Sequence, residues 1–139
     1  MVKIFLMILF VFVIVSCNKD YNVDCTTYDY SNCNTIEPTN ADVTITITKQ
    51  TKDSKVPVWL YKGKYGNSQE LIFFDTILDV ETKFNLQLNN DYYAIAKYYK
   101  NEKTIYAIDG SYLKKVGKAV CDSTCWIIKG NIIDLRLKN

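Results

Sequence analysis

The stretch ADVTITITK, residues 41–49, constrains the fold more than any other part of the chain. Its aliphatic residues Val43, Ile45 and Ile47 alternate with threonines. A two-residue period places the aliphatic side chains on one face of an extended strand, whereas a helix would scatter them around its circumference. We therefore expect a β-strand here with one buried face.

Short runs of the same kind follow through the rest of the chain. They are rich in β-branched and aromatic residues and are bounded by Gly, Asn, Asp or Ser. They cover residues 56–61, 70–75, 83–88 and 92–99, and two further pairs of runs flank Asp109-Gly110 and Gly130-Asn131. No window beyond the N-terminal segment shows a helical period. About seven to nine short strands without a long helix predict an all-β domain, a single antiparallel β-sandwich.

Two local signals refine this expectation. Asp109-Gly110 supplies the positive φ angles that a tight type I′ turn requires, so we expect a hairpin there. Pro57 stands early in its run, which indicates an edge strand or a bulge because proline cannot donate to a sheet ladder.

The N-terminus, MVKIFLMILFVFVIVSC, has the layout of a signal peptide. Lys3 precedes an unbroken apolar stretch over residues 4–15. A helix that spans a bilayer takes about 20 apolar residues, whereas the apolar region of a secretory signal has about 7 to 15. We therefore assign residues 1–17 to a signal peptide.

The end of this segment, Ile14-Val15-Ser16-Cys17, resembles the lipobox of bacterial lipoproteins. The resemblance implies that Cys17 is acylated, palmitate included, and becomes the first residue of the mature chain. Each buried CH₂ of an acyl chain contributes about 0.8 kcal/mol to membrane attachment. We expect a lipid-anchored protein of the bacterial cell envelope, at the outer membrane. The alternative is an ordinary secretory signal whose cysteine later forms a disulfide.

The mature chain divides into two parts. Residues 18–40 contain few aliphatic residues and many Asn, Asp and Thr, which predicts an irregular tether, and residues 41–139 form the sandwich domain. Removal of residues 1–17 takes Lys3 from the 17 basic residues and nothing from the 15 acidic ones, which lowers the formal net charge from +2 to +1. Nucleic-acid binding draws on clustered positive charge, so this balance argues against it.

A set of motifs runs along the mature chain. The motifs are Asp24-Cys25, Cys33, Glu37-Pro38, VPVWLYKG (56–63), Asp75-Thr76, YYAIAKY (92–98), IYAIDG (105–110), CDSTCW (121–126) and DLRL (134–137). This set is similar to a group of small, uncharacterised lipoproteins of Bacteroidetes-type bacteria. The order of the middle strands also loosely resembles prealbumin-like and CNA-B sandwiches. The resemblance implies a fold and a compartment and carries no activity with it.

With Cys17 acylated, four cysteines remain, namely Cys25, Cys33, Cys121 and Cys125. An even number in an exported chain predicts two disulfides. On proximity we favour local closure, Cys25 with Cys33 and Cys121 with Cys125; pairs between tether and loop are the alternative and would pin the tether to the sandwich. A zinc site fits less well because the first pair lacks knuckle spacing. Redox catalysis fits less well because it usually uses C-x-x-C, whereas Cys121 and Cys125 are separated by three residues.

The chain offers little to catalysis. It has no histidine, no recognisable nucleophile motif and no calcium-loop signature. Asp75, Asp79, Glu81 and Asp109 lie beside expected turns or strand ends, which favours solvated turn residues over a pair of glycosidase acids. We expect no enzyme activity, no cofactor and no metal; a hydrolase whose carboxylates converge only in the fold is the least favoured alternative.

Tyrosines suggest a binding surface. Tyr92, Tyr98, Tyr99 and Trp126 are the candidate ligand-binding residues, within an aromatic second half that is rimmed by lysines. About half of these aromatic residues should belong to the core, since they fall on both faces of a strand. We expect a non-catalytic interaction or accessory module with an unknown protein partner. The alternative is a surface glycan-binding lipoprotein that uses exposed tyrosines.

Overall fold

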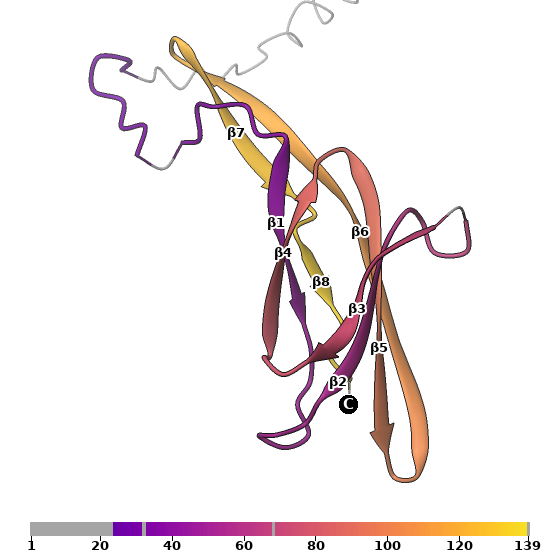
Figure 1. The fold of residues 1–139 in the computed structure, drawn as a ribbon. Helices are drawn as coiled ribbons and strands as arrows, with labels where there is room; N and C mark the ends of the chain where they lie inside the picture. Colours follow the sequence, from indigo (N-terminus) through magenta and orange to yellow (C-terminus); the bar gives the residue numbers. More distant parts are fainter. Residues whose placement is uncertain (1–23, 32, 68, 139) are drawn as a thin grey trace, which may run out of the picture.

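The structure is a computed structural model that describes residues 24–31, 33–67 and 69–138. Within these residues the chain has eight strands and no helix, and the strands form two sheets packed together as a β-sandwich (Figure 1). The predicted fold class is confirmed. The signal peptide and Cys17 lie outside the described residues. In the described ranges no helix is long and apolar enough to cross a membrane.

The sheets have three and five strands, in the orders β4-β1-β8 and β3-β2-β5-β6-β7. The strands are β1 (Asn40–Thr46), β2 (Val56–Lys62), β3 (Glu70–Ile77), β4 (Glu81–Gln87), β5 (Asn90–Lys100), β6 (Lys103–Val120), β7 (Ser123–Lys129) and β8 (Ile132–Asp134). Neighbours are antiparallel, apart from β1 and β8, which are parallel.

The core lies between the two sheets. In β1 and just after it, Val43, Ile45 and Ile47 are buried, as their alternation predicts. Val58 and Leu60 of β2 are fully buried on the facing sheet, as are the small residues Ala94 and Ala96 of β5. Aliphatic side chains from both inner faces therefore fill one continuous core.

The expectation of an edge strand at Pro57 is wrong. β2 lies between β3 and β5. Pro57 fits there because the ladder between β2 and β5 begins only at Val58, so no hydrogen bond to β5 needs the N–H that proline lacks. The edge strands of this sheet are β3 and β7.

The prediction of a hairpin at Asp109-Gly110 is also wrong, since both residues lie inside β6. The turn between β5 and β6 is made by Asn101 and Glu102, whose φ angles are 52° and 60°. Gly110 has another role, because it pairs directly with Tyr93 of β5. A Cβ atom at Gly110 would lie 2.8 Å from the Cβ of Tyr93. The second turn signal is confirmed, since Gly130, with a φ of 76°, separates β7 from β8.

β6 extends beyond the sandwich. It pairs with β5 from Lys103 to Leu113 and with β7 from Lys114 to Val120. We call this second half of β6, together with β7, the arm. Figure 1 shows the arm reaching past the two sheets, with the described part of the tether beside it.

Two disulfides join the tether to the arm, Cys25 with Cys121 and Cys33 with Cys125. The tether also forms a bridge along the edge of β7, in which Trp126 donates its N–H to the carbonyl of Asn34 at 2.9 Å. The expected disulfides are present, but the preferred local pairing is wrong.

The geometry of the arm explains the pairing. β7 starts at Ser123 and runs away from the turn that holds Cys121, so Cys125 recedes from Cys121 at about 3.3 Å per residue. A disulfide needs Cα atoms within about 7 Å of each other. The bridge between Asn34 and Trp126 brings the tether alongside instead, and the Cα atoms of the two pairs are 5.5 Å and 5.2 Å apart.

Removal of one disulfide, by replacing both of its cysteines with serine, should lower the free energy of unfolding by less than half of the loss caused by removing both disulfides. The pairs interlace, with sequence separations of 96 and 92. While one bridge is closed, the other closes only a small ring and contributes about 3 kcal/mol, whereas the last bridge contributes about 4 to 5 kcal/mol. Urea titration of the two double-serine variants and the four-serine variant measures the free energies of unfolding. Strictly additive losses would contradict the interlaced pairing.

Candidate functional site

The outer face of the five-stranded sheet, which points away from the three-stranded sheet, carries a continuous apolar surface. Two neighbouring cross-strand rows run over β3, β2, β5 and β6 with apolar residues or glycine throughout. The first row is Phe74, Trp59, Ile95 and Ile108, and the second is Leu71, Tyr61, Tyr93 and Gly110. We call these side chains, together with Tyr65 from the β2–β3 loop, the aromatic band. The water-facing side of an antiparallel sheet is usually polar, so the band needs an explanation.

Four rings of the band form two stacked pairs, each between neighbouring strands. Trp59 stacks on Phe74 with ring centroids 4.8 Å apart and planes 18° apart. Tyr61 stacks on Tyr93 at 4.8 Å and 9°. This separation is the spacing of neighbouring strands, so each ring rises from its own strand and covers the face of its neighbour. The stacked rings therefore direct their edges, more than their faces, toward solvent.

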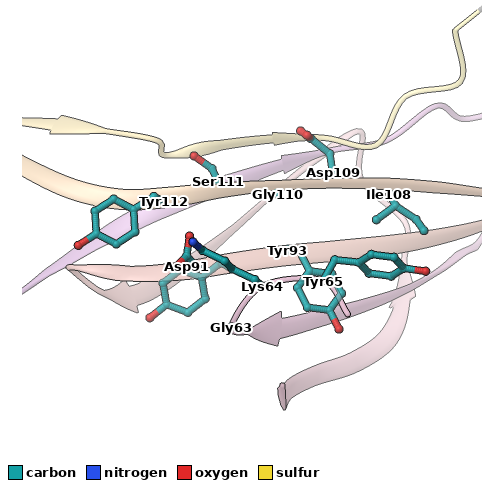
Figure 2. A pocket seen from close by; sticks show the side chains of 11 residues that line it. Gly63, Lys64, Tyr65, Asp91, Tyr93, Ile108, Asp109, Gly110, Ser111 and Tyr112 are labelled. Atoms are coloured by element: carbon teal, nitrogen blue, oxygen red, sulfur yellow. The ribbon is translucent and has the colours of Figure 1, made fainter. Parts of the chain in front are cut away.

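Tyr65 lies over the middle of the band. Its ring meets that of Tyr93 edge-on at 5.4 Å and 83° (Figure 2). Tyr93 also donates its hydroxyl to the side-chain carbonyl of Gln69, which ties the β2–β3 loop to the sheet. These contacts bury Tyr93 almost completely, although it is on the outer face, while Tyr65 itself is 64% exposed.

Two shallow hollows adjoin each other at Tyr65. One, of about 430 Å³, is bordered by the loop, by Asp91 and by residues 108–112 of β6 (Figure 2). The other, of about 400 Å³, lies over Trp59, Tyr61 and Ile95 and is bordered by Lys97 and Tyr106. Together they make one long, largely apolar depression along the band.

The charged groups around this depression do not form an acid–base pair. Lys64 and Asp91 border the first hollow, and Lys97 borders the second. Asp109 also borders the first, but Figure 2 shows it on the other side of β6 from Tyr65. There Asp109 accepts a hydrogen bond of 2.7 Å from the backbone N–H of Asp134, which links β6 to β8.

The prediction that Tyr92 and Tyr98 bind a ligand is wrong, because both side chains are buried in the core. Tyr92 donates to the carbonyl of Gln87 at 2.8 Å, and Tyr98 donates to the carbonyl of Leu135 at 2.7 Å. Burial raises the pKa of both hydroxyls. Their side chains join the two sheets and are out of reach of a ligand.

The other two expected residues lie apart from each other. Tyr99 is 65% exposed near the β5–β6 turn. Trp126 is half-buried on the arm, where its ring lies over Gly117 and under the ammonium of Lys115, 5.5 Å from the ring centroid. Neither belongs to the aromatic band, so the four residues do not form one site.

The carboxylates do not converge either. Asp75, Asp79 and Glu81 are exposed. Asp134 binds Arg136 through two hydrogen bonds of 2.7 and 2.9 Å, and these bonds hold the pKa of Asp134 well below its usual range. Over residues 24–31, 33–67 and 69–138 no three His, Cys, Asp or Glu side chains come together as metal ligands.

Sequence reasoning missed most of the aromatic band. Trp59 and Tyr61 alternate with the buried residues of VPVWLY, which predicts that both faces of this strand are apolar. What this alternation does not show is which strands are neighbours, and the band exists only because four strands align their outward residues.

Comparison of the chain with protein-family models, with curated proteins and with solved structures gave no match. The resemblance to small Bacteroidetes-type lipoproteins therefore stays a prediction.

Tyr98→Phe should lower the free energy of unfolding by about 1 to 2 kcal/mol. The hydroxyl of Tyr98 donates to Leu135 and accepts from the backbone N–H of Thr48 at 3.1 Å, so its loss leaves two buried backbone groups unpaired. Tyr99→Phe is the matched control and should change the free energy by less than about 0.5 kcal/mol, because the ring is at the surface. Urea titration measures both, and equal effects would contradict this role of Tyr98.

Proposed function

We propose that the protein is a non-catalytic, lipid-anchored module of the bacterial envelope that binds a protein partner through the aromatic band. The observation that carries the proposal is the exposure of that band. Phe74 is 57% exposed, Leu71 52% and Ile108 45%, and all three lie in the two neighbouring rows. Monomeric proteins rarely leave a contiguous apolar patch uncovered, and larger patches mark interaction sites.

The composition of the band suits a protein interface. Trp and Tyr are the residues most enriched among interface hot spots, and Trp59, Tyr61 and Tyr65 meet at one hollow. Lys97 and Tyr106 at its margin provide the polar rim that usually surrounds such a centre. The stacked pairs also fix the rings before a partner arrives, which lowers the entropy lost on binding.

The stacked rings favour a protein over a glycan. A sugar stacks on an exposed aromatic face, but the faces of Trp59 and Phe74 cover one another, as do those of Tyr61 and Tyr93. A glycan would have to use Tyr65 or Tyr106, which are 64% and 56% exposed. We therefore place glycan binding second.

Two points support a non-catalytic role. The charged side chains that border the depression from the band side are Lys64, Lys97 and Asp91, so Asp91, which is half-buried, has no second carboxylate there to share acid and base roles with. The depression is also wide and open, which suits the docking of a surface better than the exclusion of water from a reacting group.

The band can be tested by site-specific photocrosslinking in the native envelope. A photoreactive residue at Tyr106 should crosslink to one protein, whereas the same residue at Lys83, exposed on the three-stranded sheet, should not. Ile108→Asp should reduce the crosslink at least about tenfold, because it places a charge in the apolar contact. Ile132→Asp is the matched control on the other sheet, where Ile132 is 62% exposed.

Both variants should keep the circular dichroism spectrum of the parent, since the two isoleucines are at the surface. Crosslinking of equal strength from both faces would contradict a role of the band. Crosslinks to polysaccharide in place of protein would support the glycan alternative.

The anchor is tested separately. Intact mass of the protein from its native membrane should show a chain that starts at Cys17 and carries acyl groups, as the lipobox implies. Cys17→Ser should abolish the acyl mass and move the protein from the membrane fraction to the soluble fraction. An uncleaved, unmodified product would refute the anchor.

A further inference from the structure

One face of the arm is basic and apolar. Lys114 lies directly opposite Lys129 in the ladder, and Val116 lies directly opposite Ile127. Residues opposite each other point to the same face, and residues two apart on a strand do as well, so Lys118 belongs to this face too. All three lysines are exposed. Val116 and Ile127 are 36% and 48% exposed. We call these five residues the basic face.

The charges of the basic face are not neutralised within the described part of the chain. Like charges directly opposite each other in a sheet are destabilising, and no ion pair of Lys114, Lys118 or Lys129 is found there. Lys115, on the opposite face of β6, behaves differently. Its ammonium is 2.6 Å from Glu37 of the tether and donates to the carbonyl of Pro38 at 3.1 Å. The tether thus neutralises Lys115 on one face of the arm. On the other face it is bonded through Cys33 to Cys125, directly opposite Lys118, and it leaves the three lysines there without an ion pair in the described ranges.

The disulfides bring the arm close to the residue that we propose to be acylated. Cys121 is at the tip of the arm and is bonded to Cys25, which is eight residues after Cys17. Eight residues span at most about 28 Å when fully extended. The arm itself, from Lys114 to Val120, extends about 20 Å. The whole basic face is therefore within reach of the membrane surface that holds Cys17.

We propose that the basic face of the arm lies against the anionic headgroups of the membrane that anchors the protein. The inference rests on the proposed acylation of Cys17. Lys114, Lys118 and Lys129 meet the lipid phosphates, and Val116 and Ile127 enter the interfacial layer between them. Attraction of a lysine to an anionic membrane surface is worth about 1 kcal/mol, or about a fivefold change in partitioning.

The acidic residues near the tip define which side of the arm makes the contact. Asp24 and Asp29 bind the backbone N–H groups of Thr26 and Ser31, and Asp122 is exposed in the turn. Anionic lipids repel these three carboxylates. The contact is therefore made by the side of the arm and not by its tip.

Vesicle binding tests the proposal without the lipid anchor. The protein is the mature chain from residue 17 with Cys17→Ser and with both disulfides formed. It should bind vesicles of phosphatidylglycerol and phosphatidylcholine, bind vesicles of phosphatidylcholine alone much more weakly, and lose binding as salt increases. Lys114→Gln/Lys129→Gln should lower the partition coefficient for the anionic vesicles about 25-fold.

Lys100→Gln/Lys103→Gln is the matched control. These two lysines are also directly opposite each other, beside the β5–β6 turn, and their replacement removes the same charge at the far end of β6. The control variant should bind within about twofold of the parent, and neither variant should have a lower urea midpoint than the parent, since all four side chains are exposed.

Equal binding to neutral and anionic vesicles, or equal loss in the two variants, would overturn the proposal. The Cys17→Ser protein used with the vesicles carries no acyl group. Failure of the vesicle experiment is therefore distinct from failure of the proposed anchor, which intact mass tests.

Discussion

The close approach of Tyr93 to Gly110 is the contact on which the shape of the molecule depends. β6 can run without interruption from Lys103 to Val120 because Gly110 has no side chain where the Tyr93 ring rises from β5. A turn at this position would end the sheet before the arm begins. A continuous strand instead makes one rigid element that contributes both to the aromatic band and to the arm.

The second constraint is covalent. The described part of the tether before β1, residues 24–31 and 33–39, has no strand of its own and would be flexible by composition. Two interlaced disulfides, the bridge at Trp126 and the ion pair between Glu37 and Lys115 fix it to the arm. The tether is thereby held to the arm from Cys25 onward. A two-stranded arm is marginal on its own in water, so the same bonds also stabilise the arm.

Sequence reasoning succeeded where the signal is local and failed where it depends on strand neighbours. The alternation of Val43, Ile45 and Ile47 predicts a half-buried strand correctly, because burial on one face is all that the pattern reports. The hairpin prediction at Asp109-Gly110 failed because the sequence does not distinguish a glycine in a turn from a glycine in a strand. Only the strand pairing shows that Tyr93 lies opposite Gly110. The cysteine pairing failed for the same reason, since proximity in the sequence does not show that the tether runs along β7. Tyr92 and Tyr98 are core residues because an 11-residue strand buries its inner face whatever the size of the side chains.

The two proposed surfaces define one arrangement of the molecule relative to the membrane. Ile108 of the band and Val116 of the basic face are eight residues apart on the same strand, which is about 26 Å. A flexible tether would let the band approach the membrane and bury its apolar side chains there. With the tether fixed to the arm, β6 sets the distance between the band and the proposed lipid contact. In the proposed arrangement, this length of strand separates the apolar surface from the lysines that meet the lipid.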